Sequence, residues 1–276
     1  PNNYVLFNDE LWRIIGVMEN IDDGTDKKES RIKLIRNDSI GAYSWDASES
    51  NYMNGQGVNE WSLSKLKRIL NEEAYWNRTT GICYINQGAV STPCNFTKTG
   101  MTAIGKSMID DVVWHTGAND GETWIGNQVT TPQFYELERS NYNGASCLGV
   151  CNDAVERTTS WTGKVGLINP SDYGYATSGG QITSRGVCLS SLQSDWANYQ
   201  DCYINNWMFR KEQSWWTINP SKKSANNINR VYYVYDSGIN NAAHPYGNYE
   251  VYPVVYLKKS IQIASGLGTK ENPFEL

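Results

Sequence analysis

The residues best suited to chemistry in this chain are concentrated between positions 221 and 249. Six Asn, five Tyr and three Ser account for 14 of these 29 residues. Tyrosine offers a large contact area while losing few rotamers, and Asn and Ser supply hydrogen bonds of either sense. This is the chemistry of recognition rather than of bond breaking. A second interpretation stays open, in which Asn and Ser mark loops and Tyr marks an amphipathic sheet.

Strand alternation and turn chemistry define the candidate contact residues in this stretch. Residues 230–235 (RVYYVY) are predicted to form a strand with Val231, Tyr233 and Tyr235 on one face. The turn at 236–238 and the segment 240–249 are expected at the same end of a hairpin, so the flanking side chains form one patch. The predicted ligand-binding residues are Asn226, Asn227, Asn229, Tyr233, Tyr235, Ser237, Asn240, Asn241, His244, Tyr246, Asn248 and Tyr249.

Six cysteines form three couples of sequence neighbours. Disulfides are predicted for Cys83 with Cys94, Cys147 with Cys151, and Cys188 with Cys202, although six cysteines allow 15 pairings. Each would pin a loop and add about 2–3 kcal/mol by restricting the unfolded chain. Disulfides indicate an oxidising compartment. A free catalytic thiol is the alternative.

Other catalytic or metal-binding signals are sparse. His115 is expected to end a helix, His244 lies in the Asn-rich stretch, and neither has metal-ligand spacing. The carboxylate pairs Asp110/Asp111 and Glu136/Glu138 are interpreted as solvated helix faces. No nucleophile elbow, phosphate-binding loop or calcium loop is found. We therefore predict no catalytic residue, no metal and no cofactor.

Composition restricts the partners. A net charge of −5 without a basic block argues against nucleic acid. Aromatic residues reach 12%, with 11 Trp, so the core is expected to be aromatic. No apolar run approaches the roughly 20 residues that span a bilayer. The chain opens at Pro1 without a signal peptide, and we expect an ectodomain whose anchor lies upstream.

The elements expected to position these residues mix strands with short helices in one domain, residues 1–276. Predicted strands cover residues 4–7, 11–18, 31–36, 164–168, 230–235 and 251–257. Predicted helices cover 61–70 with Ser62 as N-cap and Leu63 on its buried face, 103–114 with Ile104, Met108 and Val112 buried, 131–140, and a short one within 169–177 capped by Ser171 or Asp172. Residues 77–98 and 179–207 are interpreted as loops, the second with one helical turn near 189–196.

Four segments in this order carry a family resemblance: LWRIIGV, WSLSKLKRILN, VGLINPSDYGYAT and WWTINPS…VYYVYDSG…YPVVYLKKSIQI. They resemble C-type-lectin-like domains of the formylglycine-generating-enzyme subtype. INPSDYGYA is similar to that family's L-P-[ST]-x-x-E-[WY]-x-[YF]-A segment, and YEVYPVVYL to its closing strand. Tyr252 stands where the family prefers Arg. The ending GLGTKENPFEL resembles pilin-linked surface proteins of Gram-positive gut bacteria.

The resemblance implies an α+β fold of twisted antiparallel sheets, a few short helices and long disulfide-pinned loops. It also implies a non-enzymatic extracellular module that binds a protein or glycan on another surface. Diversity-generating retroelements use this fold for variable proteins, and mutation of adenines in Asn codons yields the Tyr, Ser and His found at 221–249. A formylglycine-generating-type oxidase and a structural pilus subunit without a ligand are the alternatives.

Overall fold

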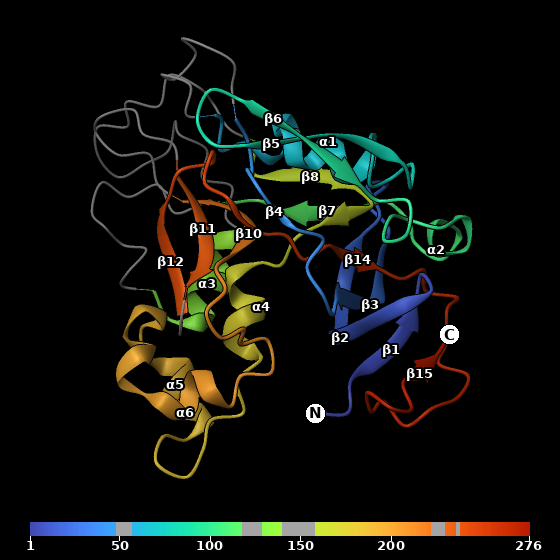
Figure 1. Ribbon diagram of the computed structural model, residues 1–276. Coiled ribbons are helices and arrows are strands. Elements are labelled where there is room, and N and C mark those ends of the chain that lie inside the picture. The colour runs from blue at the N-terminus through green and yellow to red at the C-terminus, as the bar shows by residue number, and fades with distance from the viewer. Residues whose placement is uncertain (48–56, 118–128, 140–157, 222–229, 236–237) are drawn as a thin grey trace.

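The computed structural model describes residues 1–47, 57–117, 129–139, 158–221, 230–235 and 238–276, with the backbone alone at 240–242. Across these residues the chain is α+β, as predicted, with two larger sheets and several short helices (Figure 1). Some predicted site residues lie outside the described residues, namely Cys147, Cys151, Asn226, Asn227, Asn229 and Ser237.

The larger sheet has six strands in the order β15-β1-β2-β3-β14-β9. Its strands are β1 (Tyr4–Phe7), β2 (Glu10–Asp22), β3 (Lys28–Arg36), β9 (Val165–Gly166), β14 (Val254–Tyr256) and β15 (Phe274–Glu275). The strands predicted at 4–7 and 11–18 are present and form a hairpin, whose turn residues Asn8 and Asp9 take positive φ. β15 lies parallel to β1, which makes the first and last strands neighbours (Figure 1). β14 is shorter than the predicted strand because Pro253 precedes it.

The second sheet has five strands in the order β12-β11-β10-β13-β4. It consists of β4 (Ala42–Tyr43), β10 (Trp215–Ser221), β11 (Arg230–Tyr235), β12 (Gly238–Ala243) and β13 (Tyr249–Glu250). β11 matches its prediction, whereas the central strand β10 was not predicted. All seven residues of β10 are buried, so its sequence lacks the alternation that marks a half-exposed strand.

Two predicted helices are partly wrong. Residues 61–63 form the 3₁₀ helix η2 (Trp61–Leu63), and α1 (Lys65–Asn71) begins after Ser64, whose side chain accepts from Lys67 N. Leu63 is exposed instead of buried. The predicted helix 103–114 ends early as α2 (Ala103–Ser107), with Ile104 exposed.

A strand, β7 (Val112–His115), follows α2 and pairs with β8 (Ser160–Gly163). The run Val-Val-Trp-His favours a strand, because branched and aromatic side chains suit a pleated surface. His115 therefore ends a strand, not a helix. The predicted loop 77–98 is also wrong, because β5 (Thr80–Ile85) and β6 (Val90–Asn95) form a hairpin in it.

The remaining helices are short. α3 (Thr131–Glu138) lies within the predicted helix 131–140, but its N-cap is Thr130 and not the expected Thr131. α4 (Pro170–Tyr175) has Asn169 as its N-cap, and Asp172 Oδ2 accepts from Asn169 N at 2.8 Å. The segment 179–207 was predicted as loop with one helical turn near 189–196. That turn overlaps α5 (Arg185–Ser190) and η5 (Gln193–Asn198), and α6 (Gln200–Ile204) is a further helix that was not predicted.

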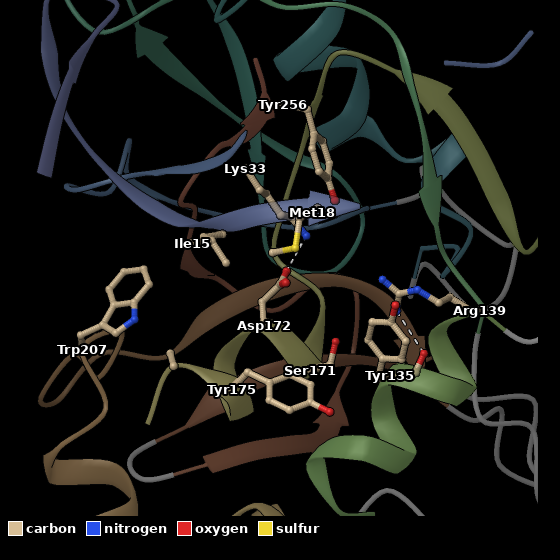
Figure 2. A pocket seen from close by; sticks show the side chains of 11 residues that line it. Ile15, Met18, Lys33, Tyr135, Arg139, Ser171, Asp172, Tyr175, Trp207 and Tyr256 are labelled. Atoms are coloured by element: carbon tan, nitrogen blue, oxygen red, sulfur yellow. Dashed lines mark hydrogen bonds and ion pairs between the residues drawn. The ribbon is translucent and has the colours of Figure 1, made fainter. Parts of the chain in front are cut away.

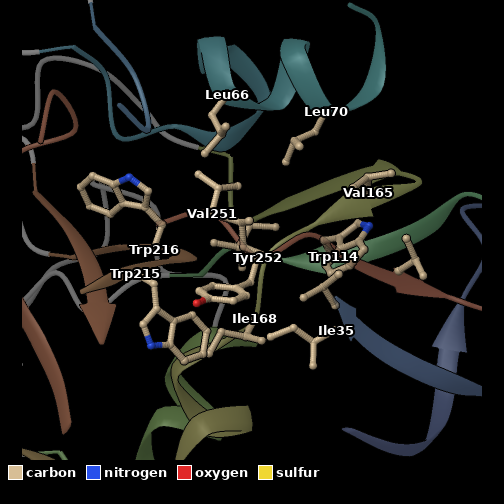
Figure 3. Packing of buried hydrophobic residues seen from close by; sticks show 14 of the residues in the cluster. Ile35, Leu66, Leu70, Trp114, Val165, Ile168, Trp215, Trp216, Val251 and Tyr252 are labelled. Carbon is tan, nitrogen blue, oxygen red and sulfur yellow. The ribbon is translucent and has the colours of Figure 1, made fainter. Parts of the chain in front are cut away.

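The two sheets share one aromatic core. Seven tryptophans are almost fully buried: Trp12, Trp45, Trp61, Trp114, Trp196, Trp215 and Trp216. Figure 3 shows Trp215, Tyr252 and Ile168 side by side, and the ring centroids of Trp215 and Tyr252 are 5.2 Å apart. The chain passes from β13 of one sheet to β14 of the other through the buried residues 251–253. The predicted aromatic core is confirmed.

Candidate binding face

The predicted contact residues are distributed along the β11–β12 hairpin rather than at one end of it. Tyr235 pairs with Gly238 beside the turn, and Val231 pairs with Ala243 at the opposite end. β12 therefore carries the chain away from the turn, and residues 244–249 follow at the far end. The prediction that the turn and segment 240–249 share one end is wrong, because residues 238–243 form a strand and not a loop.

Three predicted tyrosines nevertheless meet on one face of the five-stranded sheet. The rings of Tyr233 and Tyr249 are stacked, with centroids 4.6 Å apart and an interplanar angle of 2°. Trp216 of β10 lies edge-on to Tyr249 at 4.6 Å, and its Nε1 donates to Tyr43 O. Tyr235 extends the layer, 6.0 Å from Tyr233. We call Trp216, Tyr233, Tyr235 and Tyr249 the aromatic layer.

The side chains of the aromatic layer differ in solvent exposure, so only some of them can contact a ligand. Tyr235 is 49% exposed, whereas Tyr233 is only 8% exposed and belongs to the core. The expectation that both strand tyrosines are open to ligand is therefore wrong for Tyr233. Its ring stacks on Tyr249 and lies 6.3 Å from the Trp216 ring, and the unpredicted strand β10 places Trp216 there.

A cation and a stacked histidine border the aromatic layer. Arg230 begins β11. Burial lowers its pKa, and the nearby Tyr246, Tyr249 and Tyr233 offset only part of this shift. His244 stacks on Tyr246 with centroids 4.9 Å apart. Burial lowers the pKa of His244, and the charge of Arg230 lowers it further. Sequence reasoning did not include Arg230, and its only signal was a position next to a tyrosine-rich strand.

Asn248 connects this face to the β5–β6 hairpin. Its Nδ2 donates to Asn86 Oδ1 at 2.8 Å, and its Oδ1 accepts from Asn86 N at 3.0 Å. Asn240 and Asn241 lie in β12, where Asn240 pairs with Tyr233. The structure thus groups Tyr233, Tyr235 and Tyr249, and separately His244 with Tyr246, while Asn248 is held by the scaffold.

Three acidic residues differ from their sequence interpretation. Glu138 is 1% exposed rather than solvated and accepts hydrogen bonds from Ser171 N at 2.6 Å and Ser171 Oγ at 2.5 Å. Burial raises the pKa of Glu138 to about 7. Asp110 and Asp111 are half-exposed but lie between α2 and β7, outside any helix.

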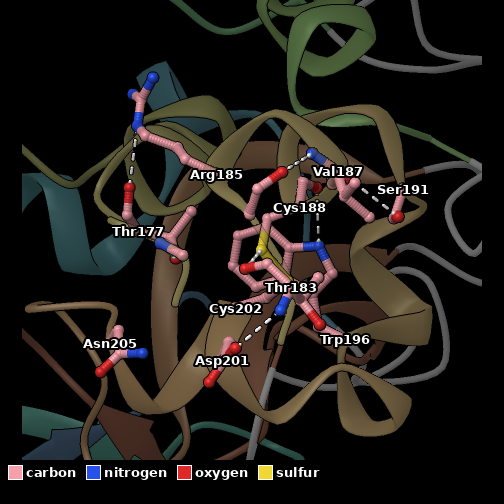
Figure 4. Close-up of a disulfide and its surroundings, with 12 residues drawn as sticks. Thr177, Thr183, Arg185, Val187, Cys188, Ser191, Trp196, Asp201, Cys202 and Asn205 are labelled. Carbon is pink, nitrogen blue, oxygen red and sulfur yellow. Dashed lines mark hydrogen bonds between the residues drawn. A yellow bond between two sulfur atoms is a disulfide. The ribbon is translucent and has the colours of Figure 1, made fainter. Parts of the chain in front are cut away.

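Two of the three predicted disulfides lie in the described residues, and both are formed. Cys83–Cys94 joins β5 to β6, and Cys188–Cys202 joins α5 to α6 (Figure 4). These bonds are consistent with an oxidising setting. Within the described ranges, no group of three His, Cys, Asp or Glu gathers as metal ligands. None of the described helices has the length and apolar character to cross a membrane.

Comparison with known proteins adds no identification. No protein-family model, curated protein or solved structure matches the chain. The function of the chain is therefore inferred from its geometry and from the motifs of its sequence.

Proposed function

We propose that this chain is a non-enzymatic, extracellular ligand-binding module with a C-type-lectin-like fold. Its binding face comprises the aromatic layer together with Arg230, His244 and Tyr246. Its ligand is a protein or glycan carried by another cell or surface. One observation carries the proposal: the half-exposed Tyr235 and the partly exposed Tyr249 rest on buried rings that a five-stranded sheet holds in place.

The aromatic side chains of the binding face are held in place before any ligand binds. Rigid aromatic side chains bind with little loss of conformational entropy, and sheet pairing on both sides of β11 already fixes their backbone. Arg230 adds a cation beside the rings, and aromatic and Arg side chains are enriched at binding hot spots.

The remaining observations support a binding role over an oxidase. Oxidation of a substrate by the resembling enzymes depends on available thiols, and the four described cysteines are joined in disulfides. Retroelement diversification fits the same face. Side chains of β11 and of segment 244–249 that reach solvent can vary without changing the buried support under them.

The test compares matched tyrosines on different faces. Arrays of glycans and of surface proteins are probed with the native chain, and the affinity for each captured ligand is measured for Tyr235→Ala and Arg230→Ala. Each change is expected to cost roughly 2 kcal/mol, about a thirtyfold rise in Kd. Tyr199→Ala is the control, because Tyr199 is 38% exposed and lies at the start of α6. Unchanged affinity in both test variants would place the site elsewhere.

A further inference from the structure

A second candidate site lies between the six-stranded sheet and helices α3 and α4. A hollow of about 120 Å³ opens there (Figure 2). Ile15 and Met18 of β2 form one side and Tyr175 of α4 the other, with Tyr135 of α3 and Trp207 at its two ends. None of these residues belongs to the binding face proposed above. We call this space the inner hollow.

The floor of the inner hollow is a buried ion pair. Lys33 Nζ donates to Asp172 Oδ2 at 2.5 Å and to Asn169 Oδ1 at 3.1 Å. Burial alone lowers the pKa of Lys33, but the charge of Asp172 and the hydroxyl of Tyr256 outweigh it and raise the pKa. The lysine therefore stays charged and Asp172 neutralises it. Because the pair is held by several hydrogen bonds, the floor is rigid and contributes little net charge.

A wider hollow of about 670 Å³ adjoins the inner one and shares the lining residues Ile15, Ala176 and Trp207 with it. The Trp207 ring is fixed by Arg13, whose guanidinium lies 4.5 Å from the ring centroid. Arg13 Nη1 also donates to Trp207 O at 3.2 Å. The two hollows thus form one groove that passes a fixed indole. We call it the Trp207 groove.

Two arginines give the Trp207 groove its charge. At the inner end, Arg139 lies 3.5 Å above the Tyr135 ring and its Nη1 contacts Glu138 Oε2 at 3.2 Å. Because burial raises the pKa of Glu138 to about 7, this carboxyl cancels only part of the arginine charge at neutral pH. At the outer end, Arg185 donates from Nε and Nη2 to the carbonyl oxygens of Thr177 and Tyr175. The groove is cationic although the whole chain carries −5.

These features favour a particular ligand class. Guanidinium groups bind carboxylates in a two-point geometry. Tyr135, Tyr175 and Trp207 offer amphipathic faces that suit the C–H faces of sugar rings. An added peptide strand would need an unpaired sheet edge, and β2 under the groove is paired with both β1 and β3. The inner hollow is smaller than the roughly 300–1,000 Å³ of a drug-sized site, so it suits one end group.

We propose that the Trp207 groove binds a short acidic saccharide. The carboxylate of its terminal sugar pairs with Arg139, and the following units cross Trp207 toward Arg185. A uronic acid and a sialic acid share this chemistry, and the experiment separates them.

The test is calorimetric titration of the full chain with oligosaccharides that end in glucuronic acid or in sialic acid. Each is matched with the neutral oligosaccharide that lacks the carboxylate. We expect one acidic ligand to bind at least tenfold more tightly than its neutral partner. Arg139→Gln and Tyr175→Ala are each expected to weaken that binding at least tenfold, and Tyr199→Ala and Tyr235→Ala to leave it unchanged.

Several outcomes would overturn the proposal. These are no binding of either acidic ligand at millimolar concentration, equal affinity for the neutral partners, and tighter binding of hexaglutamate than of both saccharides. Should Arg139→Gln fail to fold, Tyr175→Ala still decides, because Tyr175 is 40% exposed. Loss of saccharide binding in Tyr235→Ala would move the site to the other face and equally reject the groove.

Discussion

The buried Glu138 and the partly buried His115 are titratable groups whose effects on stability oppose each other. Burial raises the pKa of Glu138 from 4.5 to about 7, so between these values the folded chain holds a proton that the unfolded chain has released. The contribution of Glu138 to the free energy of unfolding therefore falls as pH rises from 4.5 to about 7. Burial, aided by Arg139 and Lys33, lowers the pKa of His115 from 6.5 to about 4. Its contribution therefore rises with pH from about 4 to 6.5.

Single substitutions should separate the two effects. Glu138→Gln removes the contribution to the free energy of unfolding that falls with rising pH. His115→Gln removes the contribution that rises with pH. From pH 4.5 to 6.5 we expect the free energy of unfolding to climb more steeply with pH in Glu138→Gln than in the native chain, and to fall in His115→Gln. Each change amounts to at most about 3 kcal/mol over the full window, at 1.36 kcal/mol per pKa unit.

The measurement is urea denaturation at half-unit pH steps, with the native chain as reference. Gln at position 138 retains an acceptor for Ser171 N, so the variant is expected to fold. Identical pH slopes in all three proteins would contradict the assignment of these groups.

The burial of single residues could not always be predicted from the sequence. Alternation along β11 correctly put Tyr233 and Tyr235 on one face, as their 6.0 Å ring contact shows. It could not tell that Tyr233 is covered, because the covering rings come from Trp216 and Tyr249 in other strands. Glu138 was interpreted as solvated for the same reason, since its partner Ser171 is 33 residues away. Burial of this kind depends on tertiary packing.

At the scale of elements, the sequence correctly predicted those helices and strands that interactions between neighbouring residues determine. The first hairpin, α3 and β11 follow from turn residues, an N-cap with Pro, and alternation. β7 was mistaken for helix because Ile104, Met108 and Val112 recur at helical spacing, and pairing with β8 decided otherwise. β10 was missed because a strand buried on both faces has no alternation.

The two described disulfides are expected to protect different elements. Residues 177–206 contain only short helices around Trp196, whose Nε1 donates to the carbonyl of Cys188, and Asp201 Oδ2 accepts from the amides of Ile182 and Thr183 (Figure 4). Replacing Cys188 and Cys202 with Ala is expected to cost about 3 kcal/mol, because a loop of about 15 residues then gains freedom in the unfolded chain.

Hydrogen exchange read by mass spectrometry distinguishes the elements. The Cys188→Ala/Cys202→Ala variant should exchange faster mainly at 177–206, and Cys83→Ala/Cys94→Ala mainly at the β5–β6 hairpin. Each double variant is the control for the other. Equal exchange at both segments in either variant would show that these disulfides do not act locally.

At the scale of the whole molecule, the two sheets are expected to unfold together. A continuous segment connects the two sheets, because only the buried residues 251–253 separate β13 of one sheet from β14 of the other. A main-chain hydrogen bond from Ile218 N to Ile168 O also links β10 of the five-stranded sheet to the segment that follows β9 of the six-stranded sheet. The one-domain organisation predicted from the sequence stays a prediction, and cooperativity is its physical test.

Val251→Ala provides that test, because Val251 is fully buried in the connecting segment. We expect the loss of about 2 kcal/mol that accompanies truncation of a buried aliphatic side chain. Native-state hydrogen exchange should show this loss equally in the slowest amides of β2–β3 and of β10–β11, with one calorimetric transition. Ile182→Ala, at a 94% exposed position, should change neither sheet. A Val251→Ala effect limited to one sheet, or two separate transitions, would mean that the sheets belong to independent folding units.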